Sequence, residues 1–237
     1  MKKVILSLIA STFTLFANNE IYLDQSGGSG TFTIKQDGTT NNLGASTKRS
    51  KLTGDAKTLT SITTGTGNEV YLDEVGNSTT TEILITGNAN KLDSKVEGDS
   101  NNTTIDVTGN SNNIKVKASV AEDVANTVTN STIDITVDGN TNDITFSMVD
   151  TDSLFNLWNL VGDLNTINSY QQGQTGGVGH SQRVDIFGSS NKVDIYQLGA
   201  ETNALDLFVI GSDNNYTITQ TDGTSATYTN PSAVTGQ

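Results

Sequence analysis

The sequence predicts an all-β fold, a β-solenoid in which every coil contributes two strands. Three observations support this: glycine recurs at a fixed spacing, apolar and polar residues alternate between the glycines, and no helical periodicity is found. The glycines from Gly54 to Gly109 follow one another in unbroken 11-residue steps. A strand-and-turn unit therefore takes about 11 residues, and a rung of two stacked units takes 22–23 residues.

Strands are expected on both sides of each marker glycine. Val184 and Ile186 precede Gly188 by four and two residues, and Val193 and Ile195 follow it by five and seven. Polar residues fill the positions between them. This alternation, bounded by Gly and Asn, is typical of a half-buried strand of about seven residues, or about 23 Å.

A turn motif, Gly-x-x-Asn, recurs in register with the strands. It occurs at Gly38/Asn41, Gly65/Asn68, Gly87/Asn90, Gly98/Asn101, Gly109/Asn112, Gly139/Asn142, Gly162/Asn165, Gly188/Asn191 and Gly211/Asn214. Four glutamines share the inward parity of the apolar residues: Gln25, Gln36, Gln197 and Gln220. Buried amides are costly unless paired, so we expect identical amides to stack as hydrogen-bonded ladders. Alternatively, Asn recurs because it tolerates turn dihedrals; glycine is expected to supply a positive φ.

Composition restricts the classes of function. Hydrophobic residues make up 33% and aromatic residues 6% of the 237 residues, and the net charge is −13. This charge argues against binding to nucleic acid or to anionic membranes. Without cysteine, neither disulfides nor thiolate metal sites can form. The basic stretch 46–57 is either a solvated loop or a docking patch for acidic surfaces or nucleic acid.

Residues 1–17 are typical of a signal peptide, with Lys2 and Lys3 followed by an apolar stretch too short to span a bilayer. We therefore expect a secreted protein with no membrane segment after cleavage. The solenoid is expected over 18–223, with loop insertions near 39–53, 118–132, 146–161 and 174–183. Residues 224–237 leave the period and contain Pro231, which cannot donate to a strand ladder, so a tail or cap is expected there.

Several segments resemble the curlin repeat of bacterial curli subunits, which has Gln, Gly and Asn at fixed spacing. They are Gln25-x-Gly27 followed by FTIKQDGTTN, then NKVDIYQLGAETN, and NNYTITQTDG. The resemblance implies a solenoid of two-strand coils that polymerises into extracellular, amyloid-type fibres of a biofilm matrix. The implied partners are other copies of the chain, with a secretion or nucleator protein as a possible addition.

Two departures from that repeat leave an alternative open. Most inward positions hold Ile, Val or Leu, and the period is interrupted. A capped, non-amyloid solenoid would carry the same repeat as a fibre or decoration subunit of a virion or appendage. The stretch DSLFNLWNLVG, 152–162, offers a candidate contact patch of Phe155, Leu157, Trp158 and Val161. Cover by the loop 174–183 or by a cap is the alternative.

No arrangement of acid, base and nucleophile indicates an enzyme, and no cofactor is expected. The single histidine, His180, ends a glycine-rich stretch that lacks the lysine of a phosphate-binding loop. Oxygen ligands for calcium occur at Asp138, Asn140, Asn142 and Asp143, but solvated turns are the default interpretation. Ice binding through outward Thr-x-Thr pairs, such as Thr31 and Thr33, is a minor alternative because the pairs are not continuous.

Overall fold

The structure is a computed structural model, and it describes most of the chain from residue 19 to residue 229. Outside the described residues lie 1–18, 120–127, 153–154, 174–180, 199–202, 222–223 and 230–237, together with the single positions 39, 66, 88, 99, 110, 130, 140, 163, 189 and 212. The expected signal peptide, His180 and most of the expected tail fall in these segments. So do large parts of two expected insertions, 118–132 and 174–183.

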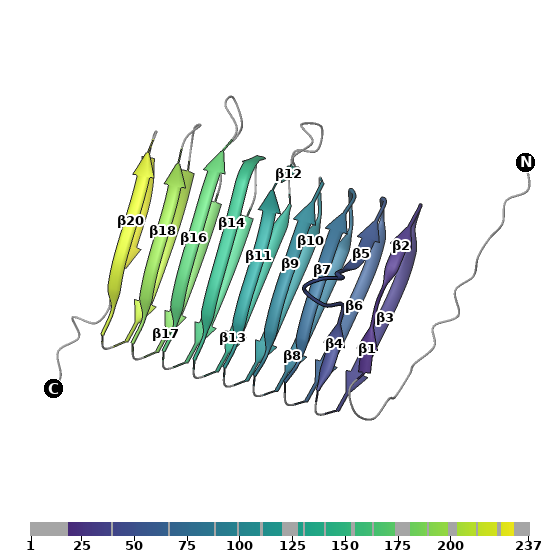
Figure 1. Ribbon diagram of the computed structural model, residues 1–237. Coiled ribbons are helices and arrows are strands. Elements are labelled where there is room, and N and C mark those ends of the chain that lie inside the picture. The colour runs from purple at the N-terminus through teal and green to yellow at the C-terminus, as the bar shows by residue number, and fades with distance from the viewer. Residues whose placement is uncertain are drawn as a thin grey trace, which may run out of the picture.

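The described chain folds into two facing parallel sheets (Figure 1). Consecutive strands alternate between the sheets, except that β1 and β2, β4 and β5, and β11 and β12 lie in the same sheet. The twelve-stranded sheet contains β1 (Asn19–Ile21), β2 (Asp24–Ser26), β4 (Asn41–Leu43), β5 (Ser50–Thr53), β7 (Glu69–Val75), β9 (Lys91–Glu97), β11 (Asn113–Ser119), β12 (Val128–Thr129), β14 (Asp143–Asp152), β16 (Thr166–Gly173), β18 (Lys192–Leu198) and β20 (Asn215–Thr221). The nine-stranded sheet contains β3 (Gly30–Asp37), β6 (Lys57–Thr64), β8 (Thr80–Thr86), β10 (Asn102–Thr108), β13 (Thr132–Asp138), β15 (Phe155–Val161), β17 (Ser181–Phe187), β19 (Asn203–Ile210) and β21 (Thr224–Thr229). The predicted β-solenoid of two-strand coils is confirmed.

The core is a single apolar layer between the two sheets. Equivalent residues of successive coils lie directly above one another, as Ile83, Ile105 and Ile135 do in β8, β10 and β13. These side chains are fully buried. The outward residues between them are mostly polar and face solvent, so the period-two pattern of the sequence becomes the inside and outside of the column.

The coils have two different edges. At one edge, which we call the Gly-x-x-Asn edge, every strand of the nine-stranded sheet except the last, β21, passes to the twelve-stranded sheet through a short turn. This edge forms the lower rim in Figure 1. At the opposite edge the chain returns through turns such as 76–79 and 98–101. Successive asparagines of the first edge are 22, 22, 30, 23, 26 and 23 residues apart, so the coil length varies where residues are inserted.

Two of the expected insertions are shorter than the sequence suggested. Within 39–53, β4 and β5 both pair with β7, and only residues 44–49 leave the ladder. Within 146–161, nearly all residues are strand, in β14 and β15. The extra length of this coil is absorbed by a longer β14, whose pairing with β16 shifts register between Val149 and Thr151. The interpretation of 146–161 as a loop was therefore wrong.

Candidate functional site

The asparagines of the Gly-x-x-Asn edge form a row of side chains along the column. From Asn68 to Asn214, each Nδ2 donates to the Oδ1 of the asparagine in the next coil, at distances of 2.8–3.4 Å. The members are Asn68, Asn90, Asn112, Asn142, Asn165, Asn191 and Asn214, and all but Asn214 are fully buried. Each Nδ2 also donates to the glycine carbonyl three residues before it, for example Asn112 to Gly109 at 3.0 Å. The amides thus pair both within and between coils.

Asn41 lies at the start of this row but bonds differently. Its Nδ2 donates to the carbonyl oxygens of Gly38, at 3.2 Å, and Thr64, at 2.9 Å. The Oδ1 of Asn68 has no hydrogen-bond partner within the structure. The continuous row therefore begins at Asn68, one coil after the position at which the repeat begins in the sequence.

The glycines of this edge are required by close approach between coils. A Cβ placed on Gly65, Gly87, Gly109, Gly139, Gly162, Gly188 or Gly211 would lie 1.4–1.7 Å from the carbonyl oxygen of the glycine one coil earlier. Four of these glycines have no φ in the left-handed region. The sequence-based explanation, a positive φ at every turn, was therefore incomplete, because glycine stacks on glycine and leaves no room for a side chain.

Gly98 and Asn101 do not belong to that row. Gly98 packs at the opposite edge, against the carbonyl oxygen of Gly76. The Oδ1 of Asn101 accepts a hydrogen bond from the backbone N of Thr79 at 3.0 Å and lies 2.9 Å from the Oγ1 of Thr79. Glycines spaced 11 residues apart lie alternately at the two edges of the column. A Gly-x-x-Asn motif that is 11 residues away from a member of the row, such as Gly98/Asn101, therefore lies at the opposite edge.

The glutamines form only part of the expected ladder. Gln197 Nε2 donates to Gln171 Oε1 at 2.8 Å, and the backbone of Gln220 is level with that of Gln197. At the other end, Gln36 donates to the carbonyl oxygen of Asn42 at 2.8 Å, and Gln25 to that of Ser26 at 3.3 Å. Between Gln25 and Gln171, the same column holds Leu52, Glu74, Val96, Ala118 and Met148, so the amides cannot be continuous there.

Three charged residues, Glu74, Lys57 and Glu97, lie buried near the opposite edge, and sequence reasoning missed them. Glu74 is 0% exposed; its carboxylate accepts hydrogen bonds from the hydroxyl of Thr81 at 2.6 Å and from that of Thr79. Burial raises the pKa of Glu74 to about 7. Lys57 is 1% exposed and donates to the carbonyl of Thr53; burial lowers its pKa. Glu74 stands two residues before Gly76, at an inward parity, and that signal was available in the sequence.

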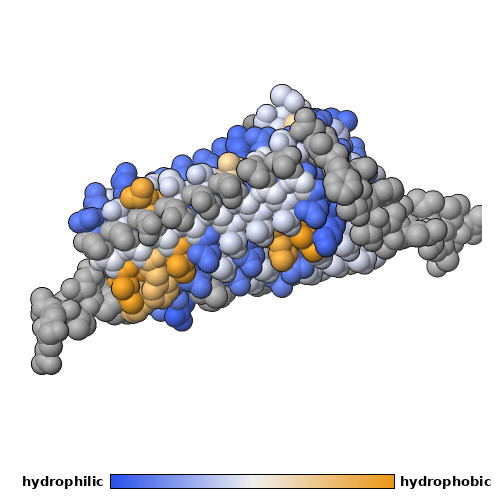
Figure 2. Space-filling model, turned by 90° about the horizontal axis from the view of Figure 1, so that it is seen from below, coloured by the Kyte–Doolittle hydropathy of each residue, from blue (hydrophilic) through white to orange (hydrophobic). Residues whose placement is uncertain are grey.

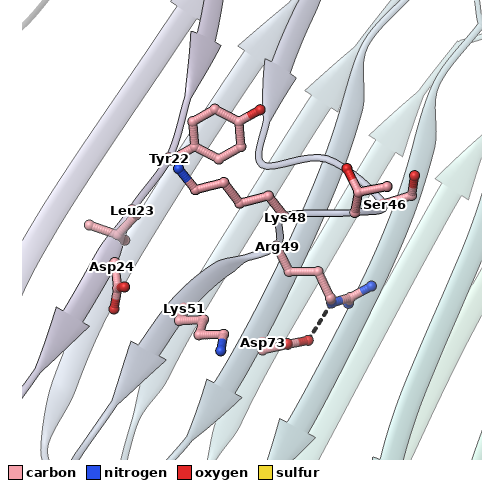
Figure 3. Close-up of a pocket in the computed structure, with 9 residues that line it drawn as sticks. Tyr22, Leu23, Asp24, Ser46, Lys48, Arg49, Lys51 and Asp73 are labelled. Atoms are coloured by element: carbon pink, nitrogen blue, oxygen red, sulfur yellow. Dashed lines mark hydrogen bonds and ion pairs between the residues drawn. The ribbon is translucent and has the colours of Figure 1, made fainter.

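Within the basic stretch 46–57, Arg49 forms ion pairs with Asp73 and Asp93 on the outer face of the twelve-stranded sheet, and we call these three residues the clasp. Arg49 pairs with Asp73 (Figure 3). It also pairs with Asp93 at 3.2 Å and donates to the carbonyl oxygens of Leu72 and Asp93. It thereby joins β7 to β9. Lys48 lies over the ring of Tyr22, 4.3 Å from its centre. Lys48, Arg49 and Asp73 border a shallow cavity of about 460 Å³, and the charge of Arg49 is paired inside the molecule.

The candidate contact patch is described only in part. Val161 is 42% exposed on the outer face of the nine-stranded sheet. The backbone of β15 places Phe155, Leu157 and Trp158 level with Ser181, Arg183 and Val184 of β17, but their side chains are outside the described part. Sequence reasoning missed two apolar residues beside Val161 in the same sheet, Phe187 and Ile210, because they belong to later coils.

Among the described residues, none covers the core at either end. Ile21 and Leu23 at the N-terminal end, and Tyr216 and Ile218 at the C-terminal end, pack against the core but remain only partly buried. Their equivalents in the intervening coils, such as Val70 of β7, are fully buried. Each terminal coil therefore presents a half-covered apolar surface together with unpaired strand edges.

Other kinds of site have little support among the described residues. Their aspartate and glutamate side chains form no group of three or more suited to a metal ion. Over the same part of the chain, no helix has the length and apolarity needed to span a membrane. Comparisons with protein-family models, curated proteins and solved structures gave no match.

Proposed function

We propose that the protein is a structural subunit that polymerises end to end through its two open coils, as an extracellular curli-like fibre or surface matrix. One observation carries the proposal: the half-buried apolar residues at the two ends occupy the same columns of the solenoid. Ile21 is level with Leu43, and the column continues through each coil to Tyr216. A second copy added head to tail would continue it.

A second column, which has a glutamine at each end, supports the same register. Gln25 begins, and Gln220 ends, one column of the twelve-stranded sheet. Ile21 and Gln25 are four residues apart, as are Tyr216 and Gln220, so no insertion intervenes at either end. Tyr216 of one copy would therefore lie level with Ile21 of the next copy, and Gln220 of the first would lie level with Gln25 of the second.

The terminal strand of the twelve-stranded sheet lacks features that block strand addition. β20 contains neither proline nor a charged residue. Charged residues and proline are the usual means by which edge strands avoid pairing with other chains. Added coils would satisfy the backbone groups of this edge and bury Tyr216 and Ile218 fully. Export to the cell exterior rests on residues 1–17, which are typical of a signal peptide.

Electron microscopy and fibre diffraction test the proposal, on the full chain and on the chain from residue 18. We expect unbranched filaments with a meridional reflection near 4.7–4.8 Å, the spacing of stacked strands. Discrete particles that seeds cannot elongate would contradict it. That outcome would favour the capped solenoid of a virion or appendage.

Two variants test the polarity of the contact. Ile21→Lys and Ile218→Lys each place a charge at one end of the core, and neither should form filaments alone. Mixed together, they retain one functional end each and should form a dimer that does not grow. Thr217→Lys, an exposed position on the outer face of β20, is the matched control and should still polymerise. Filaments from either end variant alone would refute head-to-tail stacking.

A further inference from the structure

A cluster of apolar side chains lies on the outer face of the nine-stranded sheet, beside the Gly-x-x-Asn edge. Val161, Phe187 and Ile210 form one column across β15, β17 and β19. Phe208 lies next to them, with its ring centre 5.8 Å from that of Phe187. Val161 is 42% and Ile210 43% exposed. We call these four residues the apolar corner; Figure 2 shows it as the orange area at the C-terminal end of the column, on the left.

The fold does not require apolar residues in these positions. Earlier coils fill the column of Val161 with polar side chains, namely Asp37, Thr64, Thr86, Thr108 and Asp138. Those strands pair as regularly as β15, β17 and β19 do. Clustered apolar side chains on an outer face commonly mark a contact with another molecule. The apolar corner is therefore a candidate surface for contact with another molecule.

Charge favours a second copy of the chain as that occupant. At a net charge of −13, two copies repel each other across most of their surfaces. Beside the apolar corner, the charge of Asp185 is paired with Arg183 at 3.1 Å. A basic partner would be attracted to the acidic faces instead. Another acidic copy can approach here because the surface is apolar and Arg183, paired with Asp185 and level with Asp206, offsets part of the negative charge.

The small area of the apolar corner determines whether this contact is stable between two single copies. Four side chains bury far less than the roughly 800 Å² per partner of a standard stable interface. In a head-to-tail filament, however, each subunit presents the same corner on the same side at a regular interval. Weak contacts then act together, and the binding of two filaments greatly exceeds that of two single subunits.

We infer that the apolar corner is a lateral contact through which a second copy, in a neighbouring filament, packs side by side. Facing corners related by a two-fold axis would bring Phe187 and Phe208 of the two copies together. The inference rests on the proposed function for its filaments. It adds a second surface, separate from the ends that support elongation.

The double variant Phe187→Thr/Ile210→Thr tests the lateral contact, because threonine suits an outward strand position but removes the apolar surface. The matched control is Ile62→Thr/Leu84→Thr, two half-buried outward residues of the same sheet in β6 and β8. We expect paired filaments from the unaltered protein and from the control. The double variant should give single filaments, of about half the width, that elongate at an unchanged rate. Pairing that survives in the double variant, or that is lost equally in the control, would overturn the inference.

Failure of the proposed function gives a different result. If the unaltered protein forms no filaments, sedimentation equilibrium at high concentration tests the corner on discrete particles. Dimers that dissociate in the double variant but persist in the control would support the lateral contact. Monomers in all three proteins would reject it, as would single filaments from an unaltered protein that does polymerise.

Discussion

Replacing Glu74 with glutamine should remove a pH dependence from the stability of the solenoid. Glu74 lies in the core near the edge opposite the asparagine row, 0% exposed, with its carboxylate against the hydroxyl groups of Thr79 and Thr81. Glutamine has nearly the same shape and keeps an oxygen that can accept from a threonine hydroxyl. It carries no charge at any pH, so it isolates the cost of ionising a buried carboxyl.

The size and sign of the effect follow from the pKa. Folding raises the pKa of Glu74 from 4.5 to about 7, chiefly because burial disfavours the charged form. The folded state therefore binds the proton more tightly than the unfolded chain does. The contribution of Glu74 to the free energy of unfolding is therefore fully present below pH 4.5. It decreases as the pH rises towards 7 and is lost above pH 7. The total change is about 3 kcal/mol, since one pKa unit corresponds to about 1.4 kcal/mol.

Urea denaturation between pH 5 and pH 8.5 measures this difference. We expect Glu74→Gln to be more stable than the unaltered protein at pH 8 by up to about 3 kcal/mol, with the gap narrowing steadily towards pH 5. Glu82→Gln, an exposed position on the outer face of β8, is the control and should show no such trend. A difference that is independent of pH, or that grows as the pH falls, would refute the argument.

Three further substitutions test the stacking of coils, with chemical denaturation as the measurement. Gly87→Ala should destabilise the fold by at least about 2 kcal/mol, because its Cβ would overlap a carbonyl of the preceding coil, whereas Gly28→Ala, whose Cβ meets open space, should be nearly neutral. Asn112→Ala should cost about 2–3 kcal/mol by leaving buried partners unpaired, and equal losses for the exposed Asn113→Ala would contradict this. Arg49→Ala should cost about 1–3 kcal/mol, with high salt reducing the difference; no measurable loss would show that the clasp is dispensable.

The asparagine row shows how far local sequence can indicate a site. An inward position three residues after a glycine was enough to predict that amides would stack, and seven asparagines do so. The same reasoning placed Asn101 in the row and extended the amide ladder to glutamines that lie apart. The first error arises because a pattern that repeats every half coil does not distinguish one edge from the other. The second arises because the coils between Gln25 and Gln171 carry no glutamine in that column.

The sequence by itself determined the repeating unit. The glycine period and the two-residue alternation specify strand, turn and strand, because side chains of a strand point alternately to opposite faces and only one face is apolar. Inward and outward residues of each regular strand followed directly, as did the absence of helix from the predicted fold. These properties depend on neighbours within about ten residues, which any single unit contains.

Only the tertiary structure decided what each unit lies against. Neighbours in adjacent coils are separated by 22 to 30 residues, and insertions change that separation from coil to coil. Stacking is therefore what buries Glu74, joins Arg49 to two later strands, and gathers Val161, Phe187 and Ile210 into one column. The physical reason is that coils are aligned by hydrogen bonds between strands remote in sequence, so the alternation within one strand does not specify the residue above it.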